Sequence, residues 1–183
     1  MKKLLLASVA LMLAAPAVQA QMANPAPTIQ PAPTPAEMKL PRPDRAKGIS
    51  TALAIEAAVE ANRVCLGNTY QTTSMIADSA GVPIVIISND GAKAITQRIA
   101  MSKIQAVMKY KMSSGDVAKK AAADPAFAAE IKANPMIETA RQGALAITKG
   151  SDVVGYFAVS GAPGGDKDEV CTTAGIAKIQ SRL

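Results

Sequence analysis

The hydrophobic positions in the first half of the chain predict one helix followed by two strands. Between residues 48 and 66 apolar side chains recur at helical spacing, and Gly67 offers a stop. Residues 72–78 and 82–88 are short runs rich in β-branched side chains, separated by a turn. Pro83 belongs at the start or edge of its strand because it cannot donate to a ladder. The second run is apolar at both its odd and its even positions, so we expect both faces of the strand to be covered.

A long helix is predicted within residues 88–112, after a turn at Asp90-Gly91. Its apolar positions occupy more than half of the circumference, which indicates packing against more than one surface. Lys103 lies inside that apolar arc. A charge at such a position needs a partner or a ligand, unless the side chain extends its ammonium to solvent. Both interpretations of Lys103 stay open at this point.

The second half of the chain predicts short helices, a hairpin and a final helix. The helices fall between residues 114 and 140, with Asp124 as a cap. Residues 143–148 and 153–160 flank a turn, and a helix follows from 167 to 181. Two hairpins separated by helices indicate an α+β fold with an antiparallel sheet rather than βαβ winding.

The amino-terminal residues read as a secretory signal peptide followed by a linker. Residues 1–20 have two lysines, an apolar stretch and small residues before a cleavage point after Ala20. Residues 21–46 are rich in proline and predict a flexible tail. The expected domain is therefore 47–183, in a periplasmic or secreted protein with no membrane span.

Composition narrows the possible partners. The 183 residues include no Trp, three Tyr and two Phe, so the core has to be built from aliphatic side chains and Met. Loss of Lys2 and Lys3 with the leader lowers the net charge from +6 to +4. The remaining basic residues are scattered and no aromatic residues lie among them, which argues against nucleic-acid binding.

Several chemistries are excluded by the residue types present. The chain has no histidine, which rules out a Ser-His-Asp triad and a histidine metal site. The glycine-rich loop in residues 157–171 matches neither the Walker nor the dinucleotide-binding pattern, and it carries acids that would repel phosphate. We therefore name no catalytic residue and no metal site, and an enzymatic function is the weakest of the hypotheses.

Cys65 and Cys171 are the two cysteines of the chain. In an exported protein an even number of cysteines favours a disulfide, and the alternatives are two free thiols or a metal pair. A bridge would close a loop of about a hundred residues, worth roughly 4–5 kcal/mol in loop entropy.

Ordered short motifs along the chain resemble those of the GlcG/HbpS family, a haem-binding and haem-degrading-like domain also found in some cobalamin adenosyltransferases. The stretch VVGYFAVSGAPGGDKDEVCTTAGIA is similar to the family's strand, loop, Asp-Glu pair and small-residue helix. The matching positions are Gly155, Ser160, Gly161, Asp168, Glu169 and, upstream, Asp78, Gly81, Asp90, Gly91, Ala92 and Lys103. The resemblance extends from about residue 48 to residue 179.

The resemblance implies a profilin-like fold, with the first and last helices together on one side of the sheet. That arrangement would bring Cys65 and Cys171 within reach of each other. It also implies homo-oligomers and makes haem a possible cofactor. Haem-binding relatives use a histidine ligand, so haem binding here would leave Tyr, Met, Cys or Lys as the ligand.

Two functional hypotheses follow from the residues and the resemblance. The first is an exported, non-enzymatic binding protein for a small molecule, either a tetrapyrrole or a small organic acid. Its expected ligand-binding residues are Asp90, Gly91, Lys103, Ser160 and Gly161. Asp90 could instead cap a helix and Gly161 could merely permit a turn. The second hypothesis is an oligomeric accessory or scaffold protein for a periplasmic enzyme or sensor.

Overall fold

The computed structural model describes residues 45–138 and 140–183. The predicted signal peptide and nearly all of the predicted proline-rich tail lie outside the described residues. The elements are α2 (Thr51–Gly67), β1 (Thr73–Ala77), β2 (Pro83–Ser88), α3 (Ile95–Tyr110), α4 (Ser114–Ala123), α5 (Pro125–Ala133), β3 (Ala144–Lys149), β4 (Asp152–Ser160), α6 (Gly165–Ile179) and a 3-10 turn, η1 (Gln180–Arg182). In the described part of the chain, no helix is long and apolar enough to cross a bilayer.

The four strands form one sheet in the order β2-β1-β4-β3, and every pairing is antiparallel. Thr73, the first residue of β1, is paired with Ser88 on one side and with Ser160 on the other. The start of β1 and the ends of β2 and β4 therefore meet at one end of the sheet. The α+β fold with an antiparallel sheet is confirmed.

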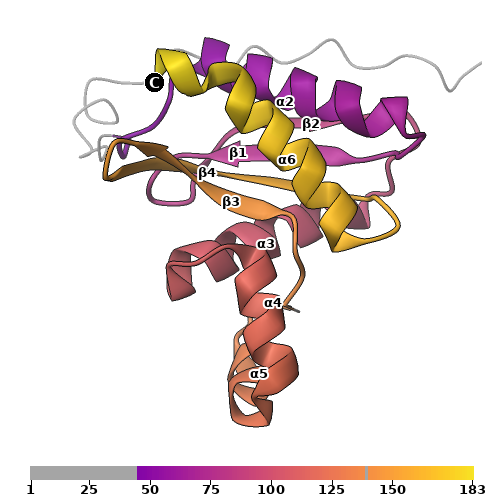
Figure 1. The fold of residues 1–183 in the computed structure, drawn as a ribbon, viewed down its shortest axis with the longest axis vertical. Helices are drawn as coiled ribbons and strands as arrows, with labels where there is room; N and C mark the ends of the chain where they lie inside the picture. Colours follow the sequence, from indigo (N-terminus) through magenta and orange to yellow (C-terminus); the bar gives the residue numbers. More distant parts are fainter. Residues whose placement is uncertain (1–44, 139) are drawn as a thin grey trace, which may run out of the picture. The chain divides into compact units, whose positions relative to one another are not determined.

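The helices form two layers around this sheet (Figure 1). Helices α2 and α6 lie side by side over one face, and α3 lies against the other face. The α2–α6 contact is close because both helices present small residues: a Cβ on Gly175 would lie 2.5 Å from the carbonyl oxygen of Ala57. The expected placement of the first and last helices on one side is therefore confirmed.

A disulfide joins α2 to α6. Cys65 and Cys171 are bonded, their Cα atoms are 5.7 Å apart, and both residues are buried in the core between the helices and the sheet. The sequence expectation of a bridge is confirmed, and neither cysteine is free.

Strand β2 departs from expectation. We expected both of its faces to be covered, yet Ile86 is 43% exposed, and Val82, just before the strand, is 53% exposed. The expectation was wrong because β2 is an edge strand, and its apolar residues Ile84, Val85 and Ile87 pack on the side that α2 covers. Pro83 is the first residue of this edge strand, where its missing N–H does no harm.

Helices α4 and α5 extend away from the sheet below α3 (Figure 1). They have a small core of their own, which includes Val117, Phe127 and Ile131. Asp124 ends α4 and caps α5, because its carboxylate accepts hydrogen bonds from the backbone N–H groups of Ala126 and Phe127 at 2.9 and 3.1 Å. The predicted cap is thus confirmed.

Candidate functional site

A cleft of about 630 Å³ lies at the end of the sheet where β1 begins and where β2 and β4 end. Its walls come from the α2–β1 loop, the turn before α3, one side of α3, the segment before β3 and the β4–α6 loop. The described lining residues are Thr69, Tyr70, Gln71, Gly91, Lys93, Ile95, Thr96, Ile99, Lys103, Arg141, Ser160, Gly161, Ala162, Pro163, Gly164, Gly165 and Asp168. This volume is in the usual range of small-molecule and cofactor sites.

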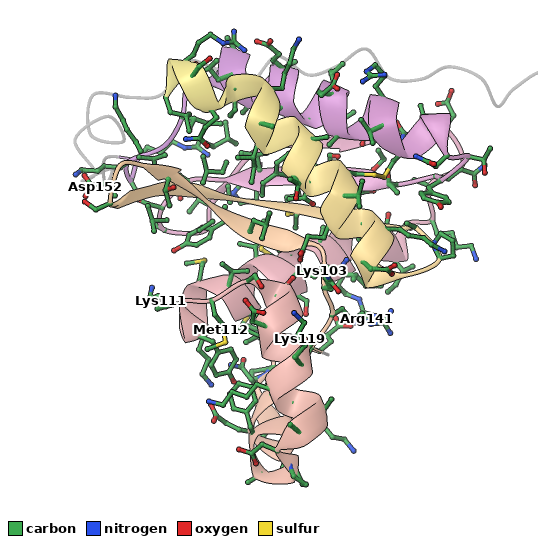
Figure 2. The ribbon with its side chains drawn as sticks, viewed as in Figure 1. Lys103, Lys111, Met112, Lys119, Arg141 and Asp152 are labelled. Carbon is green, nitrogen blue, oxygen red and sulfur yellow. A yellow bond between two sulfur atoms is a disulfide. The ribbon has the colours of Figure 1, made fainter. Side chains whose placement is uncertain are left out.

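Lys103 and Asp168 form an ion pair on the floor of the cleft. The Lys103 ammonium donates to Asp168 Oδ2 at 2.7 Å and to the carbonyl oxygen of Val159 at 2.8 Å, and the lysine is only 1% exposed. The other carboxylate oxygen of Asp168 accepts from the backbone N–H of Ala162 at 2.9 Å. Lys103, labelled in Figure 2, therefore does not extend to solvent, and its partner is Asp168. The pair connects α3 to β4 and to the first turn of α6, and through Ala162 it holds the loop before α6.

Burial acts on both members of this pair. It lowers the pKa of Lys103 below its ordinary value, and the negative charge of Asp168 opposes that change. It raises the pKa of Asp168, and the positive charge of Lys103 opposes that change. Each charge is costly to bury alone, so each residue keeps its partner ionised.

Two glycines allow the backbone to pack closely around this floor. Gly143 has φ +123, and a Cβ there would lie 2.6 Å from Lys103 Nζ and 2.7 Å from Asp168 Cβ. Gly161 has φ +131, and a Cβ there would collide with the carbonyl oxygen of Gln71. Both positions need glycine for conformation and for space.

The structure brings together four of the five residues that the sequence suggested. Gly91, Lys103, Ser160 and Gly161 all line the cleft. Asp90 does not: it is exposed and is absent from the described lining. Gly91 has φ +81 and packs against the side chain of Gln71, so it shapes the wall rather than supplying a polar group.

Sequence reasoning missed the side chains that give the cleft its chemical character. Ile95 and Ile99 form an apolar wall on α3, and Ile95 is 40% exposed. Lys93 and Arg141 add positive charge, and Tyr70 adds a phenol. Figure 2 labels Arg141 near Lys103. These residues could have been found from their places in the sequence, because they flank the ends of strands and helices that meet at one end of the sheet.

The described residues contain no group of three or more His, Cys, Asp or Glu side chains placed to hold a metal ion. Asp168 and Glu169 form the Asp-Glu pair that resembles the family motif. Glu169 accepts a hydrogen bond from the side-chain amide of Gln142 at 3.1 Å. The pair is therefore engaged with neighbouring protein groups, Asp168 with Lys103 and Glu169 with Gln142.

These features define an α+β domain with one antiparallel sheet and a cleft at its end that has an ion-paired floor, an apolar wall and cationic groups. A model of the family described as haem degrading protein HbpS-like matches residues 49–177. The chain belongs to this family, which confirms the resemblance seen in the sequence. No sequence among the curated proteins matches it.

Solved structures of related fold agree with this assignment. HbpS has a TM-score of 0.63 and 24% identity, over 76% of this chain and 94% of that chain. Protein ORFY of Klebsiella pneumoniae has a TM-score of 0.67 and 16% identity, over 79% of this chain and 98% of that chain. PduOC in complex with haem has a TM-score of 0.63 and 16% identity, over 72% of this chain and 95% of that chain. At these identities the structures support the fold alone.

Proposed function

We propose that this protein is a non-enzymatic, haem-related binding protein that holds an anionic tetrapyrrole in the cleft. The observation that carries the proposal is the combination of an apolar wall, Ile95 and Ile99, with the positive charges of Lys93 and Arg141 in a cleft of about 630 Å³. A tetrapyrrole has the matching chemistry, since it is a flat apolar ring with carboxylates at its edge. The family description and the haem complex of PduOC add support.

The residues of the cleft fit such a group. The exposed part of Ile95 would be covered by the ring, while the ammonium of Lys93 and the guanidinium of Arg141 would contact carboxylates. Lys103 would act indirectly, because its ammonium is already bound to Asp168 and Val159 and fixes the position of the β4–α6 loop. When bound, haem would supply a redox-active iron. The chain would supply a shaped pocket that shields the ring from water.

Titration of the purified protein with haem and with iron-free protoporphyrin tests the proposal. We expect saturable one-to-one binding of both, and Ile95→Glu should weaken it by about tenfold or more, because burying an isoleucine side chain is worth about 1.5–3 kcal/mol. Val170→Glu is the matched control, since Val170 is 60% exposed on α6 and lies outside the described cleft lining, whereas Ile95 is 40% exposed in the cleft. Binding of neither tetrapyrrole, with saturable binding of a small organic acid, would reassign the cleft.

Export is part of the proposal. A buried disulfide between Cys65 and Cys171 supports it, because structural disulfides persist in oxidising compartments such as the periplasm. Fractionation of cells that produce the full chain, followed by mass measurement, should find the protein in the periplasm or medium, shortened at Ala20.

A homo-oligomeric accessory protein is the second candidate function. One observation favours it: Ile55, Val59 and Leu66 on α2 are 45%, 53% and 49% exposed. Native mass spectrometry would report the assembly and any bound ligand together. An oligomer that Val59→Asp dissociates would support an interface on α2, whereas a monomer would remove this support.

A further inference from the structure

The residues that line the cleft limit which side chain could bind the iron of haem. This inference rests on the proposed function. Protein ligands of haem iron are drawn from His, Cys, Met and Tyr. The chain has no histidine, and both cysteines are joined in a disulfide. No methionine is among the described residues that line the cleft. Tyr70 is the one tyrosine among those lining residues, since Tyr110 and Tyr156 lie elsewhere.

Amines are the other groups in the cleft that could donate an electron pair to iron. The Lys103 ammonium donates to Asp168 and to the carbonyl oxygen of Val159, and a lysine must lose a proton before it can bind a metal, which would break this ion pair. Lys93 is exposed at the mouth of the cleft and serves better as a cation for a carboxylate. Lys93 therefore becomes the competitor that the experiment has to exclude.

The backbone holds Tyr70 in a defined place. Its N–H donates to the carbonyl oxygen of Cys65 at 2.9 Å, and its half-buried ring packs against the core cluster under α2 and α6. Cys65 is itself bonded to Cys171 of α6. The ammonium of Lys167, in the first turn of α6, lies 6.0 Å from the centre of the Tyr70 ring. The ring is therefore held between the core cluster and Lys167, and a side chain that binds a metal has to be held in place in this way.

We propose that Tyr70 supplies the protein ligand to the iron of ferric haem in the cleft. On binding, the phenol releases its proton to solvent, and the phenolate oxygen donates an electron pair to the ferric iron. No electron transfer and no further reactant are required. The phenol O–H bond would break, its proton would bind a solvent water, and the Fe–O bond would form while the iron stays ferric.

The test is spectroscopic and uses the purified full-length protein with ferric haem. The wild-type complex should show phenolate-to-iron charge-transfer absorption and the matching resonance Raman modes of a bound phenolate. Tyr70→Phe should lose both signatures and bind ferric haem at least about tenfold more weakly, which corresponds to about 1.4 kcal/mol. Tyr110→Phe is the control and should keep both signatures and the wild-type affinity. Lys93→Gln removes a cation placed at the ligand's carboxylates, so it should bind haem more weakly, but the complex that forms should keep both signatures. Tyr70→Phe should still bind iron-free protoporphyrin as the wild type does, because the aromatic ring is retained.

Each outcome separates the iron ligand from the proposed function. A wild-type haem complex without phenolate signatures, or a Tyr70→Phe complex that retains them, would overturn the assignment while leaving tetrapyrrole binding intact. A wild-type haem complex without phenolate signatures, whose absorption spectrum changes in Lys93→Gln but not in Tyr70→Phe, would transfer the role to that amine. Failure of the wild type to bind either haem or protoporphyrin would overturn the proposed function and the ligand assignment together.

Discussion

The floor of the cleft is a buried ion pair whose two charges depend on each other. Lys103 is 1% exposed and Asp168 is 4% exposed, and neither side chain has access to bulk water that could replace its partner. Removing one member of such a pair leaves an uncompensated charge in a poorly solvating site. This makes Lys103 a positioning residue for the β4–α6 loop rather than a group free to contact a ligand.

Lys103→Met should therefore destabilise the protein by about 3–5 kcal/mol at neutral pH. Burial already raises the pKa of Asp168, and loss of Lys103 would raise this pKa further. A carboxyl whose folded pKa exceeds its unfolded value binds more protons when folded, so stability rises as pH falls through that window. The deficit of the variant relative to wild type should shrink from about pH 7.5 to about pH 5 in urea unfolding experiments.

Lys109→Met is the control, because Lys109 lies on the same helix with a side chain that is 41% exposed. It should leave stability nearly unchanged at either pH, since exposed ion pairs contribute little. A deficit of Lys103→Met that stays constant across this range would contradict the account of Asp168 as a stranded carboxylate.

Gly161→Ala should destabilise the protein through backbone conformation and space. The residue has φ +131, and a Cβ would meet the carbonyl oxygen of Gln71. Strain of this kind costs about 1–3 kcal/mol. Gly67→Ala, at a position with no atom near the added Cβ and no positive φ, should change stability by less than about 1 kcal/mol in thermal unfolding.

At the site, residue types were easier to predict than roles. The apolar arc around Lys103 showed that its charge needed a partner, but the sequence could not show that Asp168 lies beside it. Asp90 appeared equally suitable in the sequence, but it is exposed and lies outside the described cleft lining. Tyr70 has no local pattern that marks it, since only the pairing of β1 with β4 brings its loop to the cleft.

At the scale of whole elements, α2 and α6 depend on each other through the sheet they share and through the disulfide. The bridge spans 106 positions of sequence. Reduction should lower stability by about 4–5 kcal/mol in the loop-entropy account, because it frees a long loop in the unfolded chain. Calorimetry with and without reductant should show a clearly lower Tm for the reduced protein.

Thiol titration of the unfolded, unreduced protein is the companion measurement. It should find no free sulfhydryl, whereas two sulfhydryls per chain would show that the purified protein lacks the bridge. Cys65→Ala with Cys171→Ala should match the stability of the reduced protein to within about 1 kcal/mol.

Sequence patterns located the elements well and their ends less well. The long helix begins at Ile95, since Gly91 with φ +81 and the hydrogen bond from Ala92 N–H to Asn89 O keep the preceding residues in turns. The last helix begins at Gly165, two residues before the predicted start, because the backbone of a glycine pair can still enter a helix. Strand β2 was misjudged because an apolar run does not reveal whether its strand lies at a sheet edge.

At the scale of the whole molecule, the cleft-lining residues in the described part of the chain all fall between 69 and 168. We propose that the site is complete without the proline-rich segment, so deletion of residues 21–44 should leave tetrapyrrole affinity unchanged within about twofold. Arg45 has to be kept, because its guanidinium donates to the carbonyl oxygen of Pro83 at 2.6 Å and pairs with buried Asp78.

The same deletion distinguishes the two candidate functions. A scaffold that recruits its partner through the proline-rich segment should lose the partner and keep its fold, as judged by circular dichroism and co-purification. A large loss of tetrapyrrole affinity on deletion would show that the segment contributes to the site.

The pairing of Thr73 with Ser160 also sets the order in which the protein can become functional. The central two strands of the sheet come from opposite halves of the chain, and such distant pairings form slowly because a long loop has to close first. A ribosome that has made the first hairpin has produced half of the sheet but no cleft. Ligand capture must wait until β4 and the start of α6 have been synthesised and docked, so a bound tetrapyrrole would mark a chain that has finished folding.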